Sequence, residues 1–486
     1  MTILAIDQGT TGTTTILFDE KGGIIDKAYC QFNQIYPQPG WVEHDPEEIW
    51  DSVYRTTRVI TNRNSIPIKA VGITNQRETT ILWDKTTGRP IYNAIVWQCR
   101  RTSEICKKLN ASHGPMIHKL TGLTCDPYFS GTKIKWILDN CHDYILDNLV
   151  FGTVDTWLIW KLTNGRVHAT DYTNASRTLI FNINEKKWDE ELCSILGIPV
   201  SILPEVKKSI DHFGEIESVA PLNGIPILGV AGDQQAALFG QTCFNRGQMK
   251  NTYGTGSFVV MNTGNKPKIS QRGLITTLAI DGNGEPCYAL EGSIFIAGAA
   301  IQWLRDELHL IKSASESETA AVEIKDNGGV YLVPAFVGLG APWWDSSARG
   351  TIVGLTRGSN KNHIIRAALE SMAYQTEDIL KVMKEETDIQ PDELFVDGGA
   401  TANNFCMQFQ ADISNISVVR PTVIESTALG AAFLAGLNAD IWKHSQILLS
   451  IKSVDSKFRP GMDQSLRASL LKGWKMALRQ TRVKDT

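Results

Sequence analysis

The chain has 486 residues, with 48 Lys and Arg against 52 Asp and Glu, for a formal net charge of −4. Hydrophobic residues make up 42% and charged residues 21%, values that exclude disordered, collagen-like and coiled-coil proteins. The length predicts two large domains. A slightly acidic chain does not favour a nucleic-acid partner, and no apolar stretch is long enough to span a bilayer, so membrane insertion is not expected either.

The nine cysteines are odd in number and show neither a CxxC pair nor a Cys/His metal spacing. In a chain this long they indicate reduced thiols. The N-terminal segment MTILAIDQGTTG has no basic region followed by an apolar stretch, so it does not resemble a secretory signal. We therefore expect a cytoplasmic protein.

Strand and helix patterns alternate along the first half of the chain. Residues 3–19 predict a β-hairpin with a Gly- and Thr-rich turn, and residues 70–84 predict two strands around a polar turn. Residues 132–141 have a helical period, whereas 225–240 predict a buried strand leading directly into a helix of small residues. This alternation is typical of an α/β fold.

The second half repeats this layout. Residues 249–264 predict a second strand–Gly-Thr-Gly–strand hairpin, and 295–308 and 363–383 carry apolar stripes at helical spacing. Residues 392–413 predict a strand, a Gly-Gly turn and a helix that begins near Asn403. Two hairpins of one design predict two lobes, 1–242 and 249–486, joined by the polar segment 242–248 and followed by a helical tail from about residue 440.

The two hairpin turns are candidate anion sites. The sequence has no P-loop, no GxGxxG after a strand, no HExxH and no GxSxG, which weakens the best-known nucleotide, zinc and hydrolase alternatives. Residues 9–13 and 254–256 offer main-chain N–H groups and hydroxyls without bulky side chains, as phosphates require. The competing interpretation is that tight hairpins use Gly and Thr for geometry alone.

Two aspartates end predicted strands. Asp7 follows ILAI and Asp233 follows ILGVAG, at the carboxyl ends where ligands collect in α/β sheets. Such carboxylates suit Mg²⁺ bound with a nucleotide, or the acceptance of a proton from an attacking hydroxyl. The other interpretation is that Asp233 is a helix N-cap, and the two are compatible because a helix N-terminus also stabilises an anion.

Arg77 and Glu78 in TNQRETT combine a donor fork with a carboxylate acceptor, which together satisfy both halves of a polyol hydroxyl. A surface ion pair is the alternative. Trp97 and Tyr128 add an aromatic face and a phenol, although a tryptophan is more often a core residue. In GGATANN (398–404), Gly399 and Asn403 could border a purine or simply cap a helix.

A series of motifs resembles the FGGY carbohydrate kinases. DQGTTG, GITNQRETT, IVWQCRRT, DPYFSGTK, TDYTNASRT, AGDQQAALFGQ, NTYGTG and HIIRAALES occur in the family's order, from Ile3 to about Gly436. NQRETT together with AGDQQAALFG resembles the branch of the family that phosphorylates glycerol. The resemblance implies an actin-like fold whose two lobes, each with an RNase-H-like core, close on ATP and a polyol.

The resemblance also implies roles for individual residues. Glycerol would be bound by Arg77, Glu78, Tyr128, Asp233 and Gln234, with Trp97 and Phe258 against its carbon chain. Asp233 would be the general base that prepares glycerol for transfer of the γ-phosphoryl group of ATP, and Asp7 with Asp233 would lie near Mg²⁺. The nucleotide would be contacted by Thr10, Thr11, Gly12, Thr255, Gly298, Gln302, Gly399 and Asn403. Relatives form homodimers and homotetramers, so a homo-oligomer is implied.

Two alternatives stay open at this point. One is a kinase of the same family that acts on a pentulose or another polyol, and the other is a catalytically silent regulatory protein on the same fold. The sequence also departs from the family, because Thr14 stands where an Arg is common two positions after Gly12. A phosphate contact is then absent or supplied from elsewhere.

A second departure generates a prediction. In some bacterial relatives a Gly-rich loop that ends in Arg binds fructose 1,6-bisphosphate, whereas this chain has SVAPLNGIP at 218–226 with Gly224 in the place of the Arg. We expect no inhibition by this effector, since the cation that would bind a phosphate is missing. A titration of the enzyme's activity with the sugar bisphosphate checks this, and micromolar inhibition would contradict it.

Overall fold

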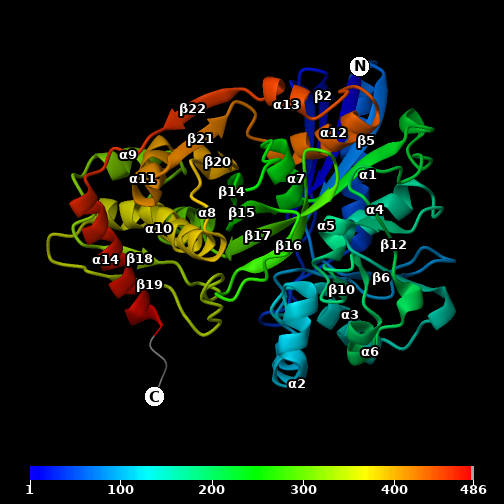
Figure 1. The fold of residues 1–486 in the computed structure, drawn as a ribbon, viewed down its shortest axis with the longest axis horizontal. Coiled ribbons are helices and arrows are strands. Elements are labelled where there is room, and N and C mark those ends of the chain that lie inside the picture. The colour runs from blue at the N-terminus through cyan, green and yellow to red at the C-terminus, as the bar shows by residue number, and fades with distance from the viewer. Residues whose placement is uncertain (483–486) are drawn as a thin grey trace.

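The computed structural model describes residues 1–482 (Figure 1). Its first sheet has the strand order β13-β5-β1-β2-β3. The strands are β1 (Thr2–Gln8), β2 (Gly12–Asp19), β3 (Ile24–Gln31), β5 (Ile68–Asn75) and β13 (Ile227–Gly232). β2 runs antiparallel to both β1 and β3, whereas β5 and β13 run parallel to β1. The predicted hairpin at 3–19 is confirmed.

The segments between these strands form the rest of the first half. Its helices are α1 (Pro46–Arg63), α2 (Ser103–Thr121), α3 (Ser130–Asn140), α4 (Val154–Leu162), α5 (Tyr172–Ala175), α6 (Glu190–Leu196) and α7 (Asp233–Gly240). Short strands complete it: β4 (Glu43–His44), β6 (Ile81–Asp84), β7 (Ala94–Ile95), β8 (Leu149–Gly152), β9 (Ala169–Asp171), β10 (Phe181–Asn182), β11 (Lys187–Trp188) and β12 (Glu205–Lys207). Single 3-10 turns lie at Leu146–Asn148, Val200–Ile202 and Ala220–Leu222.

The second sheet has the order β16-β17-β15-β14-β20-β21-β22. Its strands are β14 (Met249–Tyr253), β15 (Ser257–Gly264), β16 (Ile275–Ile280), β17 (Pro286–Ile294), β20 (Glu393–Asp397), β21 (Ser417–Pro421) and β22 (Val454–Phe458), and β18 (Tyr331–Val333) pairs separately with β19 (Thr351–Val353). The helices are α8 (Gly298–Asp306), α9 (Glu316–Val322), α10 (Lys361–Thr387), α11 (Asn404–Ser414), α12 (Ser426–Asn438), α13 (Gln446–Ile451) and α14 (Gln464–Thr481), with a 3-10 turn at Gly399–Ala402.

The two sheets share one layout. In the second sheet, β17, β15 and β14 are antiparallel and β20 and β21 continue parallel to β14, as β3, β2, β1, β5 and β13 do in the first. The α/β prediction is therefore confirmed, and the duplicated sheet matches the actin-like, RNase-H-like two-lobed arrangement implied by the resemblance.

Two helices, α7 and α12, join the lobes. The orange α12 follows the last parallel strand of the second sheet, yet it packs on β1, β5 and β13 of the first sheet and on α7 (Figure 1). Glycines allow this approach: a Cβ on Gly430 of α12 would lie 1.8 Å from the carbonyl oxygen of Ala236, and one on Gly72 of β5 would lie 2.2 Å from that of Ala431. Residues 426–438 therefore pack on the first sheet although they follow the second sheet in the chain. The division of the chain into two domains at 242–248 stays a prediction.

The tail differs from the expectation. Besides α13 and α14 it contains β22, which pairs antiparallel with β21 at the edge of the second sheet. The prediction of a wholly helical tail was wrong, because the alternation in 454–458 is short and gains its stability from the neighbouring strand. Across residues 1–482 no helix has the length and apolar character needed to cross a membrane.

The glycine contact between α7 and α12 predicts a stability effect. Gly430→Ala places a methyl group against the main chain of Ala236, so the helices must separate and the free energy of unfolding should fall by about 1–3 kcal/mol or more. Gly461→Ala is the control, because a Cβ added there would lie 4.0 Å from the nearest atom, Oδ1 of Asp412, and so meets no main chain. Urea denaturation of both variants measures the difference, and equal stabilities would contradict the packing argument.

Candidate functional site

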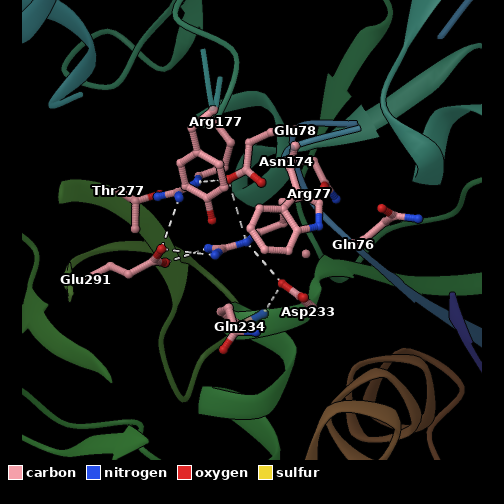
Figure 2. Close-up of polar contacts among 12 residues, drawn as sticks. Gln76, Arg77, Glu78, Asn174, Arg177, Asp233, Gln234, Thr277 and Glu291 are labelled. Carbon is pink, nitrogen blue, oxygen red and sulfur yellow. Dashed lines mark hydrogen bonds and ion pairs between the residues drawn. The ribbon is translucent and has the colours of Figure 1, made fainter. Parts of the chain in front are cut away.

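The carboxyl ends of three parallel neighbours meet at one edge of the first sheet. Asp7 lies near the end of β1, Gln76, Arg77 and Glu78 follow β5, and Asp233 follows β13 directly. Strand ends that share one edge of an α/β sheet bring their side chains together. Residues far apart in the sequence thus form one polar cluster, of which Figure 2 shows Gln76, Arg77, Glu78 and Asp233.

Arg77 lies at the centre of the cluster and only 2% of its side chain is exposed. Its Nη1 and Nη2 donate to the two carboxylate oxygens of Glu291 at 2.6 and 3.0 Å, and Nη1 also donates to Gln235 at 3.2 Å. On the other edge, Nε lies 3.0 Å from Oδ1 of Asp233 (Figure 2). The alternative of a surface ion pair is therefore wrong, and so is a plain N-cap for Asp233, because Gly232 is the N-cap of α7.

Glu78 has a left-handed main chain, with φ 60°, which a non-glycine residue adopts only when its surroundings hold it. Its carbonyl oxygen accepts from Thr80 at 3.1 Å and from Ser130 and Lys133 at 3.0 Å each. Its carboxylate accepts from Nε of Arg177 at 2.6 Å. Burial lowers the pKa of Lys133 to about 7, so this lysine is present for its hydrogen bonds rather than as a surface charge.

Several polar atoms of the cluster can still form hydrogen bonds with a ligand. An arginine has five N–H groups. Within residues 1–482 one N–H of Nη2 of Arg77 makes no hydrogen bond, whereas Nε pairs with Oδ1 of Asp233 at 3.0 Å. Oε2 of Glu78 accepts none from the same residues. The Tyr128 ring lies 5.6 Å from that of Trp97, which lies 6.3 Å from Phe258 of the second lobe. Donors, acceptors and an aromatic wall therefore occur together.

The turn between β1 and β2 lies beside this wall. Trp97 donates from its indole to Oγ1 of Thr10 at 2.9 Å, and Gln76 donates to the carbonyl of Gly9 at 3.2 Å. Thr11 is exposed at the tip of the turn. Trp97 is half-buried, so it is a wall residue rather than a core residue.

Close packing alone accounts for some of the glycines. A Cβ on Gly12 would lie 2.6 Å from the carbonyl oxygen of Cys30, and one on Gly298 would lie 2.6 Å from that of Gly254. Thr255 lies exposed in the second turn, and its carbonyl accepts from the main chain at Ala297. Anion binding by the two turns stays a prediction.

Asp7 is half-buried and close enough to Asp233 to be affected by its charge. Burial and the negative charge of Asp233 raise the pKa of Asp7 to about 8. A carboxylate that lies near a second negative charge in this way forms a position where a cation is favourable. In residues 1–482 there is no cluster of three or more His, Cys, Asp or Glu side chains suited to a metal, so further ligands would have to come from a substrate and water.

A cavity of about 490 Å³ lies in the second lobe between the Gly-Thr-Gly turn, α8, α10 and the Gly399–Ala402 turn. Its lining includes Thr255, Gly298, Gln302, Gly399 and Asn403, five residues predicted to contact the nucleotide. Leu369, Met372 and Ile301 supply an apolar side. Asn403 also caps α11 by accepting from the main chain of Cys406 at 2.9 Å, so the capping interpretation is correct and compatible with a site.

Lys250, on β14, connects the second lobe with the cluster. It is fully buried and donates to Oε1 of Gln234, to Oγ1 of Thr252 at 2.7 Å and to the carbonyl of Phe258 at 3.4 Å. Burial lowers the pKa of Lys250 to about 8, whereas the neighbouring Asp397 and Asp233 raise it. The lysine positions the side chain of Gln234 from the opposite lobe.

Sequence reasoning missed Glu291, Arg177, Lys133 and Lys250. Lys133 and Arg177 lie inside the motifs DPYFSGTK and TNASRT, and Lys250 directly precedes NTYGTG. The charged residues in or beside these motifs were the signal that could have found them. Glu291 lies in the strand sequence PCYALEGSI, where a single charge in an apolar run is the signal.

Comparison with known proteins agrees with this geometry. The N-terminal domain of the FGGY family of carbohydrate kinases matches residues 2–240, and the C-terminal domain of the family matches 249–439. Glycerol kinase of Carboxydothermus hydrogenoformans is 58% identical over 99% of this chain and 98% of its own length, and that of Fusobacterium nucleatum is 57% identical over 99% of each.

Solved structures extend the comparison. The crystal structure of Plasmodium falciparum glycerol kinase with ADP has a TM-score of 0.91 and 40% identity, and the match covers 100% of this chain and 99% of that one. A xylulose kinase from Lactobacillus acidophilus, with 23% identity, a TM-score of 0.88 and coverage of 99% and 97%, shares the fold. On these grounds the chain belongs to the FGGY family of carbohydrate kinases.

Proposed function

We propose that the protein transfers the γ-phosphoryl group of ATP to glycerol and forms sn-glycerol 3-phosphate and ADP. The glycerol kinases that resemble it over nearly their whole length support this assignment. The observation that carries it is the polar cluster at the first sheet's edge. There, within residues 1–482, one N–H of Arg77 and one carboxylate oxygen of Glu78 make no hydrogen bond, and Asp233 lies beside Arg77.

Glycerol suits this cluster because each of its hydroxyls both donates and accepts. Arg77 donates to a hydroxyl oxygen while Glu78 accepts the hydroxyl proton, and Tyr128 and Gln234 bind further hydroxyls. Trp97 and Phe258 cover the carbon chain. A site whose own polar groups are buried should reject analogues that lack a hydroxyl by up to about 10⁴-fold, because those groups would stay unpaired.

Asp233 acts as the general base. The terminal oxygen of glycerol attacks the γ-phosphorus, the bond to the leaving ADP oxygen breaks, and the hydroxyl proton moves to the Asp233 carboxylate. Nε of Arg77, 3.0 Å from Oδ1, stabilises the ionised form and orients it. Such positioned proton transfer contributes about 10²–10⁴-fold, and the remainder comes from alignment of the reactants.

The nucleotide would occupy the cavity of the second lobe. Gly298, Gln302, Gly399 and Asn403 would border the nucleoside, and Thr255 would contact the phosphates from this side. Thr10, Thr11 and Gly12 would contact them from the first lobe. Closure of the lobes over the phosphates would exclude water, which would otherwise compete with glycerol as the nucleophile.

The raised pKa of Asp7, caused by its burial and by the negative charge of Asp233, fits a divalent cation between the two side chains. Both carboxylates would hold Mg²⁺, which when bound would neutralise charge on the phosphate oxygens. We also propose a cytoplasmic location, since ATP is the phosphoryl donor and all nine cysteines are free thiols, seven of them buried and two, Cys30 and Cys141, half-buried. A homodimer or homotetramer, and the two domains 1–242 and 249–486, remain part of this proposal.

The direct test uses the purified protein with Mg-ATP and a panel of glycerol, other polyols and pentuloses. We expect ADP release with glycerol far above the other substrates, and loss of activity when Mg²⁺ is chelated. Phosphorus NMR of the product determines which hydroxyl carries the phosphate. Preference for a pentulose would favour another kinase of the family, and absence of transfer to every substrate would favour the regulatory alternative.

Asp233→Asn tests the general base. The amide preserves shape but cannot accept the proton, so kcat should fall by about 10²–10⁴-fold. Asp143→Asn is the matched control, because Asp143 is exposed and lies outside the cluster. Steady-state kinetics of both variants measure the effect, and an Asp233→Asn enzyme as fast as the wild type would refute the assignment.

A further inference from the structure

Glu291 reaches the cluster from the opposite lobe. It lies on β17 of the second sheet, is fully buried, and no sequence motif pointed to it. One oxygen accepts from Arg77 at 2.6 Å, and the other accepts from Arg77 at 3.0 Å, from Arg177 at 3.0 Å and from Ser293 at 3.1 Å. Figure 2 shows the carboxylate joined by dashed lines to both guanidinium groups.

A buried carboxylate is costly unless it is paired and hydrogen-bonded. Burial by itself raises the pKa of Glu291, but Arg177 and Arg77 outweigh burial and bring it to about 2. Glu291 is therefore a permanent negative charge that both arginines share.

The carboxylate determines which edge of Arg77 faces the ligand. Glu291 occupies the outer edge of the guanidinium, using one N–H on each Nη, and Gln235 takes the second N–H of Nη1. The edge that remains, with Nε and one N–H of Nη2, is the one beside Asp233. Without Glu291, the guanidinium would have no anionic partner on its outer edge and would turn toward Asp233.

The same carboxylate also acts on Glu78. Arg177 bridges the two acidic groups, with Nη2 on Glu291 and Nε on Glu78 at 2.6 Å. Both charged groups that would bind the polyol are thus aligned, directly or through one arginine, on a single carboxylate of the other lobe.

We propose that Glu291 is a positioning residue for the polyol site, supplied by the second lobe to hold Arg77 and Arg177 in their binding orientation. The inference rests on the proposed function and deepens it. The polyol site is complete only when the second lobe is in place, so the lobe with the nucleotide cavity also shapes the site for the acceptor.

A second glutamate provides a matched control. Glu285 directly precedes β17 and also makes an ion pair between the lobes, with Nζ of Lys208 at 2.6 Å, but both of its partners are about half exposed. An exposed pair of this kind contributes little. Glu285→Gln and Glu291→Gln therefore each remove one negative charge from the same stretch of chain, the first outside the cluster and the second inside it.

The test measures kcat and the KM for glycerol and for ATP in both variants, together with the melting temperature of each. For Glu291→Gln we expect kcat/KM for glycerol to fall about 10²-fold, mainly through KM, while the KM for ATP stays within about twofold. For Glu285→Gln we expect all constants to stay within about twofold of the wild type. A fall in activity that affects glycerol and ATP alike, in step with a loss of folded protein, would show a structural role only and overturn the inference.

Ser293→Ala keeps the inference testable if Glu291→Gln does not fold. It removes only the hydroxyl that donates to Glu291, so it should fold and raise the KM for glycerol severalfold with an unchanged KM for ATP. An unchanged KM for glycerol would contradict the positioning role. The wild type is measured first. If it phosphorylates no polyol, both the proposed function and the inference are refuted. If the wild type is active and Glu291→Gln has unchanged kinetic constants, only the inference is refuted.

Discussion

The buried ion network around Arg77 is the constraint on which the site depends. Arg77 and Arg177 are removed from water and are compensated by Glu78, Glu291 and Asp233, which come from both lobes. Burying charges is favourable only when partners and hydrogen bonds replace their hydration, so removal of one member leaves another unpaired. The network is therefore complete only when both lobes contribute their members.

The helices α7 and α12, which join the lobes, hold the two sheets against each other. Gly72, Gly240 and Gly430 allow main chain to approach main chain, and any side chain at these positions would collide with carbonyl oxygens at 1.8–2.2 Å. Because α7 begins at Asp233, the same contact that joins the lobes also places the proposed base. Packing and chemistry are thus coupled at the N-terminus of one helix.

Much of the fold and part of the site were predictable from the sequence. The two hairpins, the strand that leads into α7, and the turn after β20 all have local signals: apolar runs, Gly and Thr at the turns, and Asn403 before a helix. Asp7 and Asp233 meet because parallel strands end at a common edge, a rule that needs no coordinates. The resemblance to a family added the residues that line the cavity of the second lobe.

What the sequence determined by itself was therefore the local structure and the residues that follow strand ends, since both depend on neighbours in the chain. Only the tertiary structure decided which charges pair. Arg77 and Glu291 are 214 residues apart, and nothing near either residue indicates the other. The pairing of β22 with β21 and the packing of α12 on the first sheet likewise depend on surfaces formed elsewhere in the chain. Such contacts arise from the meeting of two lobes, and no local pattern contains that information.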